Sequence, residues 1–453
     1  MSDIMHRISA ETLALRQAVL EYSIARMDYD PVPLDRPGSL EKLKELTGQT
    51  LTDAGIGGQQ ALALFRDILA PSTVSADHPN FLSFIPAAPT EAASLFDLVV
   101  SASSIYGGSW KEGAGAIFAE NQVLEFLARE CGLPDGAGGV FVQGGTLGNL
   151  SALVSARQWA KASGRTGPWA VVCSAEAHSS LAATARVMDV ELIIAEPTPD
   201  GKFTANAADR AIAAARLSGL TPFALVGTAG TTNFGIVDRM DELSGVASKE
   251  HLWFHVDGAY GLAGILSTEH KSLYQGIENC DSFIVDPHKW LFAPFDACAL
   301  VYRNPMHAKS AHTQQADYLD VVHGDGEWNP SDYAFNLTRR VRGLPLWFSL
   351  ATHGIAVYRQ AIARSINLAR KIADVIEQRD YLQLLRQPVL SVVVFERRGW
   401  DITQYKQWSE ALLESQLAFV VPSSHLGRPN TRFAIVNPRT EFSDLVKILD
   451  TMK

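Results

Sequence analysis

The sequence predicts an α/β protein with a mostly parallel, doubly wound sheet and helices on both of its faces. Two observations support this prediction. Short apolar runs alternate with helical stretches from about residue 135 to residue 303, as they do in consecutive βαβ units. The chain has 453 residues, of which 47% are hydrophobic and 19% charged, so it is long and apolar enough to bury a large core.

The N-terminal part is expected to be helical. Residues 9–26 have the pattern of an amphipathic helix with Ser9 as its N-cap, and helical patterns return at 40–47 and 58–69. We expect residues 1–75 to form a helical segment, either as a separate layer or as an arm that packs on a partner chain.

Seven apolar runs are the expected strands of the large sheet, and they lie at 139–143, 170–174, 190–195, 222–230, 252–258, 281–290 and 297–303. Helices are expected between them, for example at 147–160 and 207–219. Residues 76–345 should therefore form the large domain. In such sheets the active site lies beyond the carboxyl ends of the strands, so the residues that follow each run are the candidates for function.

Residues 304–335 show no regular pattern, and a long irregular stretch in a compact domain is usually functional or disordered. A long helical region follows at 343–379. Strands are then expected at 391–397, 418–422 and 431–437, with helices at 402–416 and 440–452. We expect residues 346–453 to form a smaller α+β domain.

The composition argues against several classes of protein. The chain carries 39 Lys and Arg against 49 Asp and Glu, and this net charge of −10 disfavours nucleic acid or an anionic membrane as the main partner. There is no apolar run long enough for a transmembrane helix and no evident signal peptide, so a cytoplasmic protein is the expectation. None of the four cysteines stands in a CxxC pair, and we expect small buried thiols.

A lysine and an acid follow successive strands of the expected sheet. Lys289 follows the apolar run in DSFIVDPHKW, and Asp257 ends the preceding run in HLWFHVDGAYG. Either residue alone would most simply be a surface lysine or a loop carboxylate. Together they suit pyridoxal 5'-phosphate (PLP), because this cofactor forms a Schiff base with a lysine and needs a carboxylate to hold its pyridine nitrogen protonated.

Two loops of small residues are candidates for binding a phosphate. The segment QGGTLGN leads from a strand into a helix, so that backbone N–H groups and the helix N-terminus can bind an anion. It has neither the spacing of a GxGxxG motif nor the Gly-Lys-Ser/Thr of a P-loop. The segment GTAGTT at 227–232 follows another strand and can donate to the same anion.

Other kinds of site are disfavoured. His178 follows a strand in AEAHSS, where a lone histidine is more often structural than catalytic. His251 and His255 have the spacing of a helical metal pair, but their segment has the pattern of a strand and lacks the glutamate of HExxH. No metal site is therefore expected. The sequence also lacks GxSxG, which disfavours an α/β-hydrolase.

These residues carry a resemblance to a known family. The motifs QGGTLGN, AEAHSS, GTAGTT, HVDGAYG and DPHKW occur in this order, and HPNFLSFIPAAP, LTRRVRGLPLWF and TRFAIVNPRT extend the match over most of residues 75–445. The set resembles the group II PLP-dependent amino-acid decarboxylases and is similar to the aromatic-L-amino-acid decarboxylases among them. The resemblance implies fold-type-I architecture and an obligate homodimer with its two active sites at the interface.

The resemblance also implies roles for individual residues. Lys289 would be the Schiff-base lysine, Asp257 the partner of the pyridine nitrogen, and His178 a catalytic residue that stacks on the ring. Tyr318, within the irregular stretch, would return a proton to the substrate carbon. The implied cofactor-binding residues are Gly145, Thr146, His178, Thr232, Asp257, Ala259, Asp286, His288 and Lys289, and the implied substrate-binding residues are Phe84, Ile85, Pro86, Ala87, Gly108 and Thr338.

Four of these positions depart from the pattern of the aromatic enzymes. Asp286 stands in place of an asparagine near the cofactor phosphate, and an acid there needs a cationic neighbour or a shifted pose. Ala87 replaces a threonine that contacts substrate, Gly108 replaces a bulky aromatic residue contributed across the dimer, and Thr338 replaces a glycine that shapes the pocket. These departures affect the identity of the substrate and not the use of the cofactor.

The expected function is the PLP-dependent decarboxylation of an L-amino acid, preferably an aromatic one, to the amine and CO₂. An aldehyde synthase is an alternative, but retention of His178 and Tyr318 favours plain decarboxylation. A glutamate or 2,4-diaminobutyrate decarboxylase should need a buried counter-charge, which FLSFIPAAP does not supply. A nicotinamide-dependent enzyme is disfavoured because the sequence lacks the GxGxxG motif. A non-catalytic scaffold would not explain the presence of Lys289, Asp257 and Tyr318 together.

Overall fold

The structure is a computed structural model that describes residues 4–314 and 327–453. Its main element is a seven-stranded sheet with the order β1-β7-β6-β5-β4-β2-β3. Strands β2 to β6 run parallel to their neighbours among themselves, and β7 runs antiparallel to both β1 and β6. The strands are β1 (Gly138–Val142), β2 (Trp169–Ser174), β3 (Glu191–Ala195), β4 (Thr221–Thr228), β5 (Trp253–Asp257), β6 (Ser282–Val285) and β7 (Cys298–Tyr302). The predicted mostly parallel sheet is confirmed.

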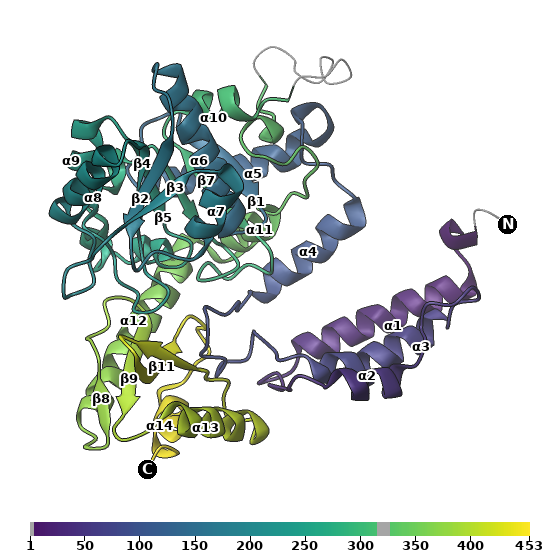
Figure 1. The fold of residues 1–453 in the computed structure, drawn as a ribbon. Coiled ribbons are helices and arrows are strands. Elements are labelled where there is room, and N and C mark those ends of the chain that lie inside the picture. The colour runs from purple at the N-terminus through teal and green to yellow at the C-terminus, as the bar shows by residue number, and fades with distance from the viewer. Residues whose placement is uncertain (1–3, 315–326) are drawn as a thin grey trace.

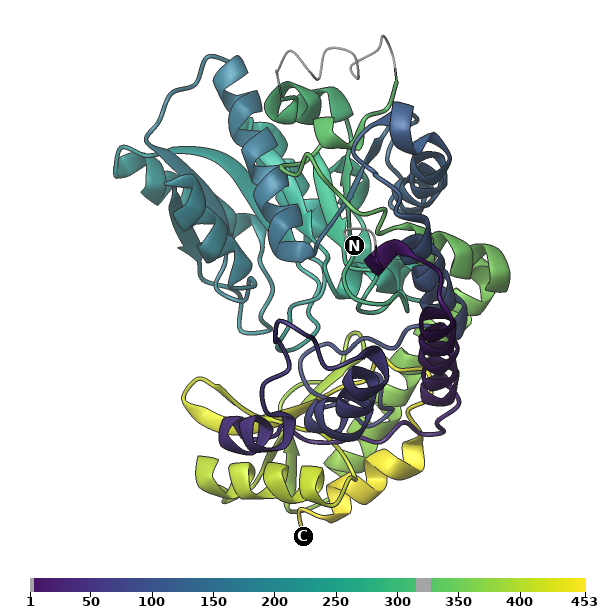
Figure 2. The same cartoon turned by 90° about the vertical axis from the view of Figure 1, so that its right-hand side faces the viewer.

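Helices cover both faces of this sheet, as Figures 1 and 2 show. One core lies between the sheet and α5 (Trp110–Glu130), α8 (Ala205–Leu217) and α9 (Met240–Glu250). The other lies between the sheet and α6 (Gly145–Ala162), α7 (Ser180–Met188) and α10 (Pro305–His312). Successive residues of a strand point to opposite faces, so Phe254 and Val256 enter the first core while Trp253 enters the second.

The N-terminal helices form an arm beside the rest of the chain (Figure 1). They are α1 (Ala10–Met27), α2 (Leu40–Thr47) and α3 (Gly58–Leu64), and none of them contains a buried residue. Ser9 is the N-cap of α1, because its hydroxyl accepts a hydrogen bond from the backbone N–H of Thr12. Helix α4 (Glu91–Ser103) connects this arm to the large sheet.

The C-terminal part contains a second, antiparallel sheet with the order β10-β11-β9-β8. Its strands are β8 (Leu382–Leu384), β9 (Val392–Arg397), β10 (Pro422–His425) and β11 (Arg428–Ala434). Helices α12 (Ile355–Glu377), α13 (Ile402–Glu414) and α14 (Phe442–Asp450) pack on it around a third core. Helix α11 (Leu344–His353) precedes them. The domain boundaries after residues 75 and 345 stay predictions.

One expectation about local structure was wrong, and the structure refines two others. Residues 418–421 form no strand: Phe419 makes an isolated bridge to Phe81, and Ala418 and Val420 are buried without belonging to a ladder. The helical region 343–379 is two helices, separated by Gly354, whose φ of 78° ends the first. The stretch 304–335 is partly regular, because Asn304 caps helix α10 and Pro305 begins it.

Two further expectations can be compared with the structure. All four cysteines are buried, and none forms a disulfide. Across residues 4–314 and 327–453, no helix combines the length and the apolar character needed to span a membrane.

Candidate active site

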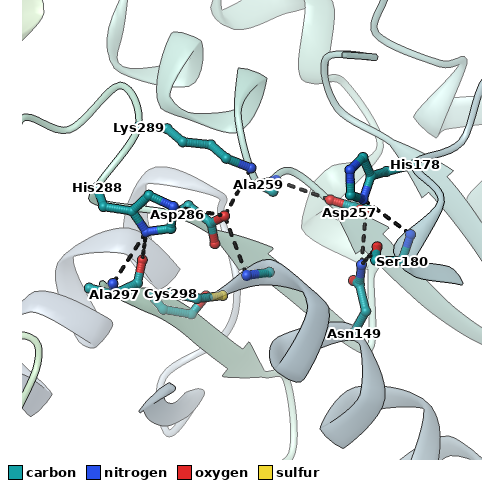
Figure 3. Close-up of polar contacts among 12 residues, drawn as sticks. Asn149, His178, Ser180, Asp257, Ala259, Asp286, His288, Lys289, Ala297 and Cys298 are labelled. Atoms are coloured by element: carbon teal, nitrogen blue, oxygen red, sulfur yellow. Dashed lines mark hydrogen bonds and ion pairs between the residues drawn. The ribbon is translucent and has the colours of Figure 1, made fainter. Parts of the chain in front are cut away.

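The loops that follow β1, β2, β5 and β6 line one cavity of about 580 Å³ at the carboxyl edge of the sheet. Figure 3 shows the residues that meet there. Eight of the predicted cofactor residues line this cavity: Gly145, Thr146, His178, Asp257, Ala259, Asp286, His288 and Lys289. Their segments are far apart in the sequence, so the parallel sheet is what brings them together.

Lys289 makes an ion pair with Asp286, with 2.9 Å between Nζ and Oδ2. The backbone N–H of Lys289 also donates to the carbonyl of Asp286 at 3.0 Å, so the two residues share one turn after β6. Burial would lower the pKa of Lys289, but the carboxylate of Asp286 outweighs it and raises the pKa above its ordinary value. Lys289 is therefore the cationic neighbour that an acid at position 286 needs.

Asp286 also contacts the N-terminus of α6. Its Oδ2 accepts a hydrogen bond of 3.3 Å from the backbone N–H of Gly145, and His288 Nε2 lies 3.7 Å from the same oxygen. His288 is held on its other side, where Nδ1 lies 2.7 Å from the carbonyl oxygen of Ala297. Burial lowers the pKa of His288, which favours a neutral imidazole.

Asp257 lies at the end of β5, buried except for 4% of its surface. Its Oδ2 accepts from Asn149 Nδ2 at 2.9 Å, and its Oδ1 accepts from the backbone N–H of Ala259 at 3.1 Å. A carboxylate offers about four lone-pair positions, so Asp257 retains the capacity to accept from a further donor.

His178 is exposed at the cavity, in the turn that precedes α7. The backbone N–H of Ser180 donates to its Nδ1 at 3.2 Å, which fixes the ring and places the proton of a neutral imidazole on Nε2. His178 and Asp257 both line the cavity, and both are labelled in Figure 3.

The residues of this cavity fit PLP. A lysine amine can bond to the aldehyde of the cofactor, a buried carboxylate can hold its pyridine nitrogen, and the N-terminus of α6 can bind its phosphate. Gly145 leaves space at the N-terminus of α6, because a Cβ at this position would lie 3.1 Å from Asp286 Oδ2 and 3.2 Å from Ala259 Cβ. Asp286 is the exception, since it adds negative charge beside the phosphate position; its Oδ1 is buried without a hydrogen-bond partner among the described residues.

Thr232 and the segment 84–87 are predicted site residues that do not line this cavity as described. Arg432 of β11 instead links Thr232 and Phe84. Its guanidinium donates a hydrogen bond to the backbone carbonyl of Thr232 and another, of 3.5 Å, to the backbone carbonyl of Phe84. Ile85 packs against the core that lies between the large sheet and α5, α8 and α9, while Pro86 and Ala87 are buried.

Gly108 and Thr338 also lie away from the cavity lining, but they lie near each other. The backbone N–H of Gly107 donates to the carbonyl of Arg339 at 3.0 Å, and the Arg339 guanidinium donates back to the carbonyl of Gly107 at 2.7 Å. A Cβ at Gly108 would overlap the hydroxyl of Tyr106. The remaining predicted residue, Tyr318, lies outside the described residues.

Two residues of the site were missed by the sequence analysis. Asn149 lies one turn after Gly145 on α6, within the quoted motif QGGTLGN, so its i, i+4 spacing placed it on the same helix face. His255 lies two residues before Asp257, and this spacing puts both side chains on one face of β5. His255 lies in strand β5, as expected for its segment, whereas His251 is the C-cap residue of α9.

Comparison with known proteins identifies the family. A model of the pyridoxal-dependent decarboxylase conserved domain matches residues 40–398. An aromatic-L-amino-acid decarboxylase from Bacillus atrophaeus is 30% identical over 393 residues, which cover 83% of this chain and 81% of that protein. An L-2,4-diaminobutyrate decarboxylase from Acinetobacter baumannii is 25% identical over 382 residues, covering 79% and 75% of the two chains. A 4-hydroxyphenylacetaldehyde synthase from Rhodiola rosea is 27% identical over 370 residues, covering 78% and 75%.

Solved structures share the fold. The structure of Oryza sativa TDC with PLP and tryptamine superposes with a TM-score of 0.90 at 23% identity, over 98% of this chain and 97% of that one. Mouse CSAD superposes with a TM-score of 0.89 at 24% identity, over 97% and 98%. The predicted fold-type-I architecture is thereby confirmed. The domain match and the decarboxylase relatives make this protein a PLP-dependent carboxy-lyase that acts on an amino acid. The chain belongs to the pyridoxal-dependent decarboxylase family.

Proposed function

We propose that this enzyme decarboxylates an aromatic L-amino acid to the corresponding amine and CO₂. The observation that supports this substrate class is the apolar wall of the cavity. It is lined by Leu147, Leu150, Ala183, Val187 and Phe295. Val187 is 72% exposed and Phe295 61%, so an aromatic side chain placed against them would remove apolar surface from water.

A charged substrate is less well supported. A glutamate side chain would need a cation, but no arginine is among the described residues that line the cavity, and Lys289 is paired with Asp286. A diaminobutyrate side chain would need an acid. Asp296 lines the cavity, but Arg342 Nε already lies 2.8 Å from its Oδ1.

The chemistry divides among few residues. Bound PLP supplies an electron sink for the electron pair that CO₂ leaves behind. Lys289 would hold the cofactor through its Nζ. Asp257 would hold the pyridine nitrogen protonated, and such a preorganised charge in a dry site is worth about 3 kcal/mol. His178 would stack on the cofactor ring, and Ala259 would pack against it.

The final proton is assigned to Tyr318. Its phenolic Oη would deliver a proton to the substrate carbon that lost the carboxyl group. Retention of both His178 and Tyr318 supports release of an amine and not of an aldehyde, which distinguishes this proposal from the reaction named for the Rhodiola rosea relative.

We also propose that the enzyme is a homodimer with its active sites at the interface. Helices α1 to α3 bury no residue in the single chain, and α4 exposes Leu95, Leu98 and Val99. A second copy would cover this apolar surface. It would also explain why Gly108 and Thr338 lie away from the cavity of their own chain. Sedimentation of wild type and of Leu98→Glu would test this: we expect a dimer that the substitution weakens, and a monomeric, fully active wild type would contradict it.

The reaction is tested with the purified yellow holoenzyme. It should be incubated with tyrosine, tryptophan, phenylalanine, dihydroxyphenylalanine, glutamate and 2,4-diaminobutyrate, and the products identified by mass. We expect an amine from one or more of the aromatic substrates, without hydrogen peroxide. An amine formed only from a charged substrate, or an aldehyde formed together with peroxide, would overturn the proposed reaction.

A further inference from the structure

Asp257 is the end of a chain of buried hydrogen bonds that the proposed reaction does not use. Asn149 joins it to His255: its Nδ2 donates to Asp257 Oδ2 at 2.9 Å, and its Oδ1 lies 2.9 Å from His255 Nε2. His255 Nδ1 lies 2.8 Å from Ser282 Oγ, which accepts from Trp253 Nε1, also at 2.8 Å. Asn149, His255 and Ser282 are wholly buried.

The fold places these groups together. Trp253, His255 and Asp257 alternate along β5 and therefore share one face, the face toward α6 and its Asn149. Ser282 begins the neighbouring parallel strand β6 in register with His255. The contacts thus run from the start of one strand to the carboxylate at its end, through rigid elements of the sheet.

The direction of each bond follows from the chemistry of its ends. A carboxylate oxygen only accepts, so the NH₂ of Asn149 must face Asp257 and its oxygen must face His255. His255 Nε2 must then carry a proton and donate it to Asn149 Oδ1. At the other end, the indole N–H of Trp253 can only donate, so Ser282 Oγ accepts that hydrogen bond. The hydroxyl of Ser282 then donates a hydrogen bond to His255 Nδ1. His255 is therefore a neutral imidazole with its proton on Nε2, in keeping with the burial that lowers its pKa to about 4.

We propose that His255 is a positioning residue for the cofactor acid. Its Nε2–H fixes the amide of Asn149 with the donor side toward Asp257, and so holds the carboxylate in the orientation that meets the pyridine nitrogen. Without that donor, Asn149 Nδ2 keeps its contacts to Asp257 and, at 3.0 Å, to Ser180 Oγ, but the amide oxygen loses its partner and the amide is held less firmly. This inference rests on the proposed role of Asp257 and adds the residues that make it effective.

The test compares two variants of His255 with a matched control. His255→Leu removes the donor, whereas His255→Gln retains a side-chain N–H. His312→Leu is the control, because His312 is also buried and its Nε2 also contacts α6, at 3.1 Å from Ser155 Oγ and 3.0 Å from Ser151 O. For each full-length variant we would measure the dissociation constant of PLP, the visible spectrum of the holoenzyme against pH, and the melting temperature.

We expect His255→Leu to bind PLP about tenfold more weakly, the size that corresponds to weakening the hydrogen bond that Asn149 donates to the charged Asp257. The pH at which its cofactor spectrum changes should also shift, because the pyridine nitrogen would lose part of its support. His255→Gln should recover most of the affinity. The His312→Leu control should melt at a lower temperature and bind PLP as wild type does.

A double-mutant comparison separates positioning from a general loss of structure. Asn149→Ala removes the contact between Asn149 and His255 by changing the other partner. This variant also serves as the test if His255→Leu does not fold. Combining the two substitutions should weaken PLP binding no more than the stronger single one does, because both act through one contact. Additive losses, or wild-type affinity and spectrum in His255→Leu with only a lower melting temperature, would overturn the inference.

Asp257→Asn keeps this result distinct from the proposed function. If Asp257→Asn weakens PLP binding and His255→Leu does not, only the positioning role of His255 is wrong. If Asp257→Asn itself binds PLP with unchanged affinity and spectrum, Asp257 is not the partner of the pyridine nitrogen. The proposed role of His255 is then wrong as well.

Discussion

The ion pair between Lys289 and Asp286 leads to a prediction about cofactor affinity. The pair joins Nζ to Oδ2 at 2.9 Å, and the same Nζ is the atom that we expect to bond to PLP. The ion pair and the Schiff base compete for this nitrogen, because a nitrogen that is bonded to PLP is no longer the ammonium group that pairs with Asp286. Asp286→Asn removes the charge and keeps the shape. We therefore predict that the variant binds PLP more tightly and that its apoprotein is less stable.

The size of the effect follows from the geometry. At 2.9 Å two unit charges attract by about 6 kcal/mol at an effective dielectric constant of about 20, and desolvation offsets much of this. Breaking a buried pair costs about 3–5 kcal/mol, whereas an exposed pair contributes about 0–1 kcal/mol. The side chain of Asp286 is 2% exposed and that of Lys289 24%, so we take an intermediate value of about 2 kcal/mol.

This value predicts two measurable changes. A free energy of about 2 kcal/mol corresponds to a dissociation constant for PLP that is about 30-fold lower in Asp286→Asn. Unfolding entropy of about 2.1 cal/mol/K per residue gives about 1 kcal/mol per degree for 453 residues, so the variant apoprotein should melt about 2 °C lower.

The assay is a titration of apoprotein with PLP, followed by the absorbance of the Schiff base at a series of pH values. The carboxylate of Asp286 holds the pKa of Lys289 up against the effect of burial, so reconstitution of the variant should reach its half-maximal rate at lower pH. Asp296→Asn is the matched control, because Asp296 lines the same cavity but pairs with Arg342. Weaker PLP binding in Asp286→Asn, with Asp296→Asn unchanged, would refute the competition between ion pair and cofactor.

Three further predictions concern the site and its surroundings. Lys289→Ala should abolish both the absorbance of bound PLP and the release of CO₂, and retention of turnover would contradict its role. Gly108→Ala should destabilise the protein by about 1–3 kcal/mol in thermal unfolding, because its Cβ would overlap the hydroxyl of Tyr106 and lie 2.6 Å from the carbonyl oxygen of Leu337; an unchanged melting temperature would contradict this packing. Burial lowers the pKa of His255 to about 4, so the unfolded chain takes up a proton at higher pH than the folded chain, and stability should be lost as the pH falls from about 6.5 toward about 4. Denaturant unfolding should show that loss in wild type and a smaller one in His255→Gln.

The parts of the site that the sequence predicted are those that depend on a strand and the residue after it. Asp257 and Lys289 follow apolar runs that do form β5 and β6, and in a parallel sheet the ends of such strands meet at one edge. The predicted phosphate loop follows the same pattern, because Gly145 begins α6 shortly after the end of β1. In each case a local pattern and one rule of topology were sufficient.

The remaining features depend on contacts between distant segments. Arg432 reaches the carbonyls of Thr232 and Phe84 across about 200 and about 350 residues of sequence, and no local pattern encodes such a contact. The chain from Asn149 to His255 needs the exact packing of α6 on β5. Phe419 lies in an apolar run with the pattern of a strand, but its ring packs against Phe81 and the residue belongs to neither sheet.

The measurement that tests the central claim most directly is the location of the Schiff base. The holoenzyme should be reduced with borohydride, which fixes the cofactor to the nitrogen that holds it, then digested and examined by mass spectrometry. The account predicts a single pyridoxyl group on the peptide that contains Lys289, and its loss in Lys289→Ala. A pyridoxyl group on another lysine, or no labelled peptide from a yellow enzyme that releases CO₂, would contradict it.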